Sequence, residues 1–314
     1  MSHSDYAIEI TGLNKTYRAS GRSPEKVALR DVDLKIKKGS VFGLLGPNGA
    51  GKSTIINIMA GLVMKSSGQV SVWGNDIDVD PRNARAAIGI MPQEINYDAF
   101  FTPRQMLDLQ AGLYGVPKAQ RRSDEILAMV GLSDKANSYA RALSGGMKRR
   151  LLMAKAMVHN PPILVLDEPT AGVDIELRQQ LWENVKTLNA RGVTILLTTH
   201  YLEEAQGLCD EIAIINHGRV ITCEDTESLL SRVENKEIRF RLNVETLAEV
   251  PEELKAFGAE KTGKRSVLIR YCPSEASVEQ MIAAIHRAGY EILDISTEES
   301  DLEDVFLQLT RDAA

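Results

Sequence analysis

The sequence predicts an α/β protein in which a parallel β-sheet carries an inserted helical subdomain and a small α+β domain follows. Three observations support this fold class. Short apolar runs rich in β-branched residues alternate with helical patterns, which is typical of a sheet buried on both faces. Between about residues 95 and 159, helical periodicity replaces that alternation. Beyond residue 232 the pattern changes again, to half-exposed strands and two helical segments.

The 314 residues are enough for one large domain or two smaller ones. We divide them into an α/β domain at 1–232, with the helical subdomain at about 95–159, and an α+β domain at 233–314. In the second domain, strands are expected at 238–242 and 267–271, and helices at 278–288 and 301–309. We find no internal repeat in the sequence.

Residues 7–10 and 32–36 alternate between apolar and polar, which is the pattern of half-buried strands, whereas 41–45 is a continuous apolar run. We expect strands at residues 7–10, 32–36, 41–45 and 70–73. Glycine and proline mark an exposed loop at 18–26, and polar residues with glycine mark turns at 37–39 and 66–68.

The run between the strand at 41–45 and the helical segment at 55–59 is the most informative one. It matches the phosphate-loop pattern G-x-x-x-x-G-K-[ST] and consists of Gly46, Pro47, Asn48, Gly49, Ala50, Gly51, Lys52, Ser53 and Thr54. Glycines let several backbone N–H groups turn towards one anion, and the following helix adds its positive end. Lys52 supplies a full charge for terminal phosphates, and the Ser53 hydroxyl is a ligand that Mg²⁺ accepts. An ordinary glycine turn between strand and helix is the alternative.

Two carboxylates, Asp167 and Glu168, end the apolar run at 163–166. In phosphate-loop NTPases a neighbouring strand delivers an acidic residue to the metal ion. We therefore expect Asp167 to act on Mg²⁺ through water and Glu168 to point towards the attacking water. A pair of solvated acids at a strand end is the alternative.

A long helical pattern at 149–158 follows the run Leu143, Ser144, Gly145 and Gly146. Ser144 is a favourable N-cap, and the two glycines permit close backbone approach to an anion. The alternative interpretation of this run is an ordinary helix cap with a flexible start. The basic cluster at 148–150, on the first turns of this helix, is interpreted as a solvated face.

The joint order of these runs resembles the nucleotide-binding subunits of ABC transporters over roughly residues 7–230. Each motif of that family has a counterpart here: Gln93 at the Q-loop, Leu143 to Gly146 at the signature, Asp167 and Glu168 at the Walker B pair, Asp174 at the D-loop, His200 at the switch histidine and Tyr17 at the aromatic that stacks on adenine. Two departures are Met147, where many members have Gln, and the variant D-loop at 171–174.

The resemblance implies a head-to-tail dimer of two copies that sandwiches two ATP molecules with Mg²⁺. Each site would combine the phosphate loop of one copy with Ser144, Gly145, Gly146 and Asp174 of the other. Within one copy, Ser53, Gln93 and Asp167 would hold Mg²⁺. Glu168 would polarise the attacking water, which His200 would help to hold at the γ-phosphate.

Several of these residues also have ordinary structural interpretations. Gln93 is compatible with a surface loop, His200 with a structural histidine and Tyr17 with core packing. Asp174 is also a good N-cap for the amphipathic helix that follows, whose apolar side carries Leu177, Leu181, Val185 and Leu188.

The runs at 168–174 and 297–307 are similar to the branch that exports drugs, lipid-linked saccharides or polysaccharides. This implies an ATPase that energises a membrane exporter through a separate polytopic permease, with Phe100, Phe101 and residues 104–114 forming part of the dock. The alternatives are a soluble, non-transport ABC ATPase and the ATPase subunit of an importer. Ribosome-acting members usually carry two cassettes and DNA-repair members a coiled coil, and neither is evident here.

Composition narrows the expected partners and location. The formal net charge is −6, without the basic footprint of a nucleic-acid binder. Cys209, Cys223 and Cys272 form no metal or disulfide spacing, which suits a reducing cytosol. No apolar signal core or run of about 20 apolar residues occurs. We therefore expect no transmembrane segment and no nucleic-acid partner, and we place the protein at the cytoplasmic face of the inner (plasma) membrane through its permease.

Overall fold

A computed structural model describes residues 4–19, 24–94, 98–171, 173, 175–231, 236–271, 276–298 and 302–312. The chain forms two compact units that divide between Thr226 and Glu227. The sequence analysis placed the division after residue 232. Asp174, Gly172, Cys272, residues 95–97 of the helical subdomain and residues 299–301 of the tail lie outside the described residues.

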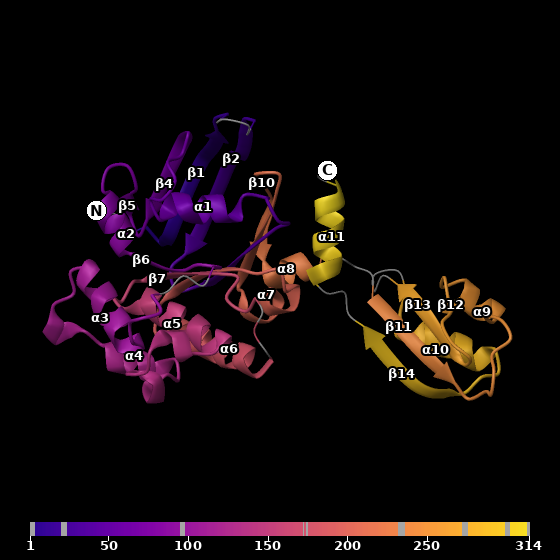
Figure 1. Ribbon diagram of the computed structural model, residues 1–314. Coiled ribbons are helices and arrows are strands. Elements are labelled where there is room, and N and C mark those ends of the chain that lie inside the picture. Colours follow the sequence, from indigo (N-terminus) through magenta and orange to yellow (C-terminus); the bar gives the residue numbers. More distant parts are fainter. Residues whose placement is uncertain are drawn as a thin grey trace. The chain divides into compact units, whose positions relative to one another are not determined.

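The first unit is built on a six-stranded sheet with the order β10-β9-β3-β8-β7-β6. Figure 1 labels three of its strands, β6, β7 and β10. Its strands are β3 (Val41–Leu45), β6 (Ile88–Met91), β7 (Ile163–Asp167), β8 (Thr194–Thr198), β9 (Glu211–Asn216) and β10 (Arg219–Asp225). All neighbours pair in parallel except β10, which runs antiparallel to β9. Every residue of β3 and β8 is buried, which explains why these strands read as continuous apolar runs.

A second sheet of the first unit is antiparallel, with the order β2-β1-β4-β5. It contains β1 (Tyr6–Tyr17), β2 (Lys26–Lys37), β4 (Ser67–Val72) and β5 (Asn75–Asp76). The turn predicted at 66–68 is wrong for Ser67 and Gly68, which belong to β4. Gly68 is needed for another reason: a Cβ there would come within 2.3 Å of the Gly12 carbonyl oxygen on β1.

One hydrophobic core joins the two sheets of this unit to α1 (Lys52–Met59). Ile10 of β1, Phe42 of β3 and Ile55 of α1 are all fully buried in it. Burying each such side chain contributes about 1.5–3 kcal/mol. Because the strand before the phosphate loop and the helix after it are both anchored in this core, the two ends of the loop are fixed.

Helices occupy most of the predicted helical subdomain. One short helix, α2 (Pro81–Ala86), precedes the subdomain. Within it lie α3 (Pro103–Leu113), α4 (Ser123–Met129) and α5 (Gly145–Met157), with short 3₁₀ turns η1 (Lys118–Gln120), η2 (Ser133–Lys135) and η3 (Ala140–Ala142). Thr102 and Gln105 form a capping box at the start of α3. Ser144 caps α5, as predicted, and the helix begins four residues before the predicted start at 149.

Two further helices of the first unit are α6 (Ile175–Ala190) and α7 (Leu202–Leu208). The apolar side predicted for α6 is confirmed at Leu181, Val185 and Leu188, which are buried. The helix α8 (Thr226–Ser231) begins at the division between the units.

The second unit contains an antiparallel sheet with the order β12-β13-β11-β14. Its elements are β11 (Lys236–Leu242), α9 (Glu252–Lys255), β12 (Glu260–Lys261), β13 (Ser266–Tyr271), α10 (Val278–Arg287), β14 (Ile292–Glu298) and α11 (Leu302–Asp312). Burial alternates along the end of β11, as predicted for a half-exposed strand. Phe240 of β11, Ile269 of β13 and Met281 of α10 meet in a separate core.

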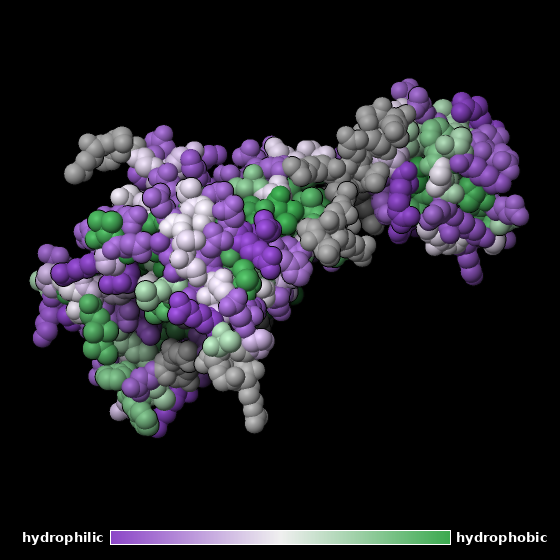
Figure 2. All heavy atoms as spheres, turned by 90° about the horizontal axis from the view of Figure 1, so that it is seen from above, coloured by the Kyte–Doolittle hydropathy of each residue, from purple (hydrophilic) through white to green (hydrophobic). Residues whose placement is uncertain are grey.

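Hydrophilic residues predominate on the face drawn in Figure 2, with hydrophobic residues in small groups between them. Among the described helices, none has both the length and the apolar composition that crossing a bilayer requires. Cys209 and Cys223 are free thiols. Burial raises the pKa of Cys223 to about 12, and that of Cys209 also rises, so both thiols stay protonated at neutral pH.

Candidate functional site

The phosphate loop follows β3 and ends where α1 begins. Gly49 and Gly51 have φ values of +82° and +120°, in a region that side chains disfavour. Gly46 is needed for space, since a Cβ there would approach the Ile215 carbonyl oxygen to 2.2 Å. These residues therefore adopt the curled backbone that the sequence pattern predicts.

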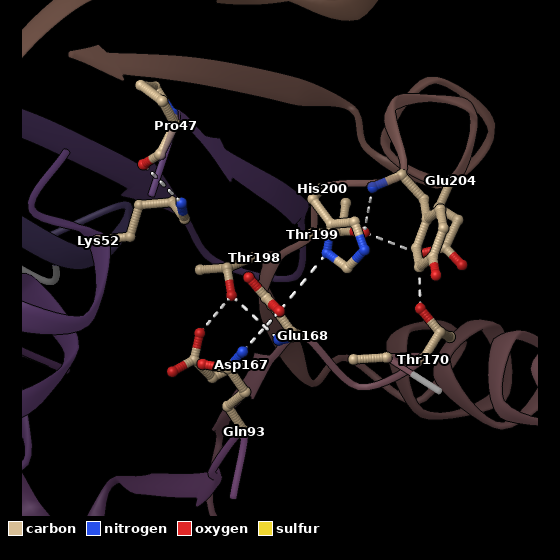
Figure 3. Close-up of polar contacts among 12 residues, drawn as sticks. Pro47, Lys52, Gln93, Asp167, Glu168, Thr170, Thr198, Thr199, His200 and Glu204 are labelled. Carbon is tan, nitrogen blue, oxygen red and sulfur yellow. Dashed lines mark hydrogen bonds and ion pairs between the residues drawn. The ribbon is translucent and has the colours of Figure 1, made fainter. Parts of the chain in front are cut away.

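Lys52, the first residue of α1, is only 8% exposed. Its ammonium group donates to the carbonyl oxygens of Gly46 (2.6 Å) and Pro47 (3.2 Å), the second of which Figure 3 shows. Burial lowers the pKa of Lys52, and the negative charges of Glu168 and Asp167 oppose that shift. The loop thus holds a cation on the side that faces the two carboxylates.

Asp167 and Thr198 end the neighbouring parallel strands β7 and β8, so their side chains meet at the same edge of the sheet. The Thr198 hydroxyl donates to Asp167 Oδ1 (2.5 Å) and accepts from the backbone N–H of Glu168 (3.1 Å). Burial and the nearby charge of Glu168 raise the pKa of Asp167, whereas the Thr198 hydrogen bond and Lys52 lower it. Sequence reasoning did not identify Thr198 as part of the site.

Glu168 adopts a left-handed backbone conformation with φ of +48°. A non-glycine residue there costs on the order of 1–3 kcal/mol, and such strain is frequent at functional sites. One carboxylate oxygen of Glu168 accepts from Gln93 Nε2 (2.8 Å) and lies 3.5 Å from His200 Nδ1 (Figure 3). The structure therefore brings together three residues that are far apart in the sequence, and the Glu168 side chain is only 11% exposed.

A pocket of about 260 Å³ lies beside the phosphate loop. It is lined by Tyr17, Lys26, Ala28, Asn48, Gly49, Gly51, Lys52, Ser53, Thr54, Gln93 and Glu168. The Tyr17 residue is 38% exposed, and the Lys15 ammonium lies 4.7 Å from the centre of its ring. An aromatic ring, the backbone of the glycine-rich loop and a carboxylate thus surround one cavity. Two larger cavities, of about 350 and 310 Å³, lie away from the loop.

The residues expected to hold Mg²⁺ all offer oxygen donors, which this hard ion requires. Gln93 uses its amide nitrogen on Glu168, so this hydrogen bond does not engage its amide oxygen. In the described part of the chain, no three His, Cys, Asp or Glu residues form a metal cluster. A donor set of Ser53, Gln93 and Asp167 therefore fits an ion that takes its other ligands from water and phosphate, as Mg²⁺ usually does.

Ser144 and Gly145 are exposed at the start of α5, and Gly146 is partly exposed. The Ser144 hydroxyl accepts from the Met147 backbone N–H (3.3 Å), and a Cβ at Gly145 would meet nothing within 4 Å. None of the three is among the residues that line the pocket beside the phosphate loop. Within one copy, the structure does not bring the predicted signature residues to the predicted nucleotide.

The interpretation of residues 148–150 as a solvated face is wrong for Arg149, which is 7% exposed. Its guanidinium donates to the carbonyl oxygens of Gln93 (2.6 Å) and Ala171 (3.3 Å). Leu152, Met153 and Ala156, at helical spacing from Arg149, are buried as well. That spacing is the sequence signal that places Arg149 on the inner side of α5.

Glu204 on α7 is a second buried residue that sequence reasoning missed. One of its carboxylate oxygens accepts from the hydroxyls of Thr170 and Thr199, both at 2.9 Å (Figure 3), and the other lies 3.3 Å from Arg178 Nε. Thr170 follows Glu168 closely, and Thr199 precedes His200. Glu204 therefore ties together the segments that carry two predicted site residues.

Replacing Glu204 by alanine should reduce the free energy of unfolding by about 3–5 kcal/mol, the usual loss when one partner of a buried ion pair is removed. Thr170 and Thr199, which are 1% and 2% exposed, would also lose their acceptor. Urea denaturation measures the change. Glu203→Ala, an exposed position on the same helix, is the control and should change stability by less than about 0.5 kcal/mol. Equal losses in the two variants would contradict this account.

Comparisons with known proteins show what this chain is similar to. A sequence model of the family described as ABC transporter matches residues 29–171. The linearmycin resistance ATP-binding protein LnrL of Bacillus subtilis (strain 168) is 35% identical over 304 residues, 91% of this chain and 94% of that protein. The Nod factor export ATP-binding protein I of Rhizobium sp. (strain N33) is 34% identical over 315 residues and 98% of each chain.

A solved structure gives the same result for the fold. The ATP-binding cassette MJ0796, in a dimeric post-hydrolysis state bound to ADP and Pi, superposes with a TM-score of 0.63 at 28% identity. The match covers 70% of this chain and 98% of that one. The similarity therefore extends over nearly the whole of that cassette.

Proposed function

This chain belongs to the ABC transporter family as an ATP-binding subunit with ATPase activity, and from this premise we propose that it drives export through a separate membrane permease. Its relatives by sequence are named for drug resistance and for export. They align along more than nine-tenths of this chain, so the similarity includes the second unit as well as the cassette. ATP, with Mg²⁺, is the cofactor of this ATPase.

The observation that carries the proposed ATP site is the pocket beside the phosphate loop. We assign the loop backbone, Lys52 and Thr54 to the phosphates and Tyr17 to the adenine. Ser53, Gln93 and Asp167 would hold Mg²⁺, which neutralises charge on the β- and γ-phosphates.

Glu168 is the assigned base, because its carboxylate is held in place by Gln93 and adjoins His200. In this arrangement the carboxylate polarises a water molecule for in-line attack, and His200 helps to hold that water. General-base assistance of this kind contributes about 10²–10⁴-fold to rate.

We further propose a head-to-tail dimer in which Ser144, Gly145, Gly146 and Asp174 of one copy complete the site of the other. The exposed start of α5 supports this, because Ser144 and Gly145 lie outside their own chain's pocket. The α5 N-terminus carries partial positive charge and suits a γ-phosphate. Binding of ATP would then favour the closed dimer, and hydrolysis would favour its separation.

A different surface of the first unit is proposed as the permease dock. The 350 Å³ cavity there is lined by residues that include Leu62, Gln110 and Tyr114, so it reaches the segment 104–114 named from the sequence. Large apolar side chains are exposed at or near this segment: Leu62 at 77%, Leu113 at 75% and Phe100 at 74%. Such exposure is typical of an interaction site. Attachment here would hold the protein at the cytoplasmic face of the membrane.

The double substitution Leu62→Asp with Leu113→Asp should abolish co-purification with the permease while ATP binding stays unchanged. Two charges would have to be buried in the apolar contact, at a cost of several kcal/mol per ion. The measurement is detergent extraction and affinity purification after co-expression with a candidate permease, a polytopic membrane protein. Val79→Asp, at a position 84% exposed and outside the cavity lining, is the control.

Retention of the permease by the double variant would argue against this docking surface. A parent chain that sediments with ribosomes and never purifies with a permease would instead favour a soluble ABC ATPase. Reconstitution of the pair in vesicles, with candidate cargoes added on either side, tests the export direction.

A further inference from the structure

Arg149 places a guanidinium group inside the first unit, where the residues that the structure describes provide no acidic partner for it. The residue is 7% exposed, and no carboxylate of the described residues forms an ion pair with it. Its Nε is buried and has no hydrogen-bond partner. Burial lowers the pKa of Arg149, and the negative charge of Glu168 opposes this shift.

Such a group is a poor way to stabilise a fold. Burying a cation is costly unless it is paired and fully hydrogen-bonded, and an apolar side chain of similar volume is often neutral or better for stability. Any advantage of a buried Arg149 must therefore come from the segments that its guanidinium holds in place. Its two terminal nitrogens bond separate segments, one at the Gln93 carbonyl and one at the Ala171 carbonyl.

These two segments meet again at Glu168. The side chain of Gln93 donates to the Glu168 carboxylate (2.8 Å), and the backbone N–H of Ala171 donates to the Glu168 carbonyl (3.3 Å). Arg149, Gln93, Glu168 and Ala171 therefore form a closed ring of hydrogen bonds. Arg149 is the one member of that ring that lies on α5, the helix that begins after Ser144.

We propose that Arg149 is a positioning residue for ATP hydrolysis, which holds the Gln93 amide against the Glu168 carboxylate. Arg149 itself does not line the nucleotide pocket, so it acts by orientation and makes no contact with ATP. The inference rests on the proposed role of Glu168. A fork of two donors is required because the two carbonyls belong to different segments, and a lysine ammonium cannot reproduce that geometry.

The test uses the full chain with Arg149→Met and Arg149→Lys. We expect Arg149→Met to lower kcat about 10²-fold, the loss that a misplacement of about 1 Å can cause. Arg149→Lys should recover only part of it. The Kd for ATP, measured by calorimetry, should stay within about twofold of the parent value, since the phosphate loop is untouched. The urea midpoint of Arg149→Met should equal or exceed that of the parent.

Arg150 provides a matched control on the same helix. Its guanidinium also donates to two carbonyl oxygens, those of Val130 and Gly131, both at 2.9 Å, and its Nε is also buried without a partner. Neither carbonyl belongs to the site. Arg150→Met should therefore leave kcat within about twofold of the parent, whatever it does to stability.

Parental kcat in Arg149→Met would overturn the inference. So would an equal fall of kcat and of the urea midpoint in the Arg149 and Arg150 variants, because that pattern marks a structural role. Assaying Glu168→Gln in parallel distinguishes a failure of the positioning role of Arg149 from a failure of the proposed role of Glu168. If Glu168→Gln is slow while Arg149→Met is fast, the positioning role alone fails; if Glu168→Gln is fast, the proposed role of Glu168 fails.

Discussion

Glu168→Gln is expected to bind ATP with parental affinity and to hydrolyse it at least about 10²-fold more slowly. The amide keeps the size of the side chain and still offers an oxygen to Gln93 Nε2. It has no negative charge with which to polarise water, so the general-base contribution of about 10²–10⁴-fold is lost. Because the closed dimer would no longer be opened by hydrolysis, the variant should also accumulate as an ATP-bound dimer.

Single-turnover hydrolysis and size-exclusion chromatography with ATP measure these two effects. Glu203→Gln makes the same chemical change at an exposed position and should hydrolyse ATP at the parental rate. A Glu168→Gln variant that turns over as fast as the parent would show that another group activates the water.

Lys52→Ala is expected to weaken ATP binding roughly 10–150-fold. The substitution removes a hydrogen bond to a charged group, worth about 1.5–3 kcal/mol, and each 1.4 kcal/mol changes affinity tenfold. The fold itself should not suffer, because burial already disfavours the charged form of Lys52 and its partners within the chain are two loop carbonyls.

Calorimetric titration with ATP checks the affinity, and thermal unfolding without nucleotide checks the fold. Lys118→Ala, an exposed lysine in η1, is the control for loss of one positive charge. Unchanged ATP affinity in Lys52→Ala would remove the phosphate loop from the proposed site. The two substitutions also differ in kind, since Lys52→Ala acts on binding and Glu168→Gln on turnover.

Local patterns predicted most of the elements around the site. The strand, loop and helix that carry Gly46 to Thr54 are consecutive, so spacing and glycine content suffice to identify them. Ser144 was recognisable as a helix cap because capping depends on residues three positions apart. The turn predicted at 66–68 failed because glycine is favoured both in turns and where two strands pack closely. Gly68 serves the close packing of strands.

The features that local patterns did not predict depend on the order of the strands in the sheet. The antiparallel β10 at the sheet edge and the contact of Thr198 with Asp167 both follow from which strands become neighbours. Buried polar residues were harder to recognise. Arg149 is marked only by its helical spacing from buried apolar residues, and Glu204 looks like an ordinary surface charge until its partners are known.

By itself, the sequence determined that this chain has a phosphate loop, a strand ending in two carboxylates and a capped helix with two leading glycines. Only the tertiary structure decided that Gln93 and His200 meet at one carboxylate oxygen of Glu168 and that Arg149 donates to the Gln93 carbonyl. The reason is physical: conformational preferences act over a few neighbouring residues, whereas the contact of Gln93 with Glu168 spans 75 positions and exists only once the sheet has brought β6 beside β7.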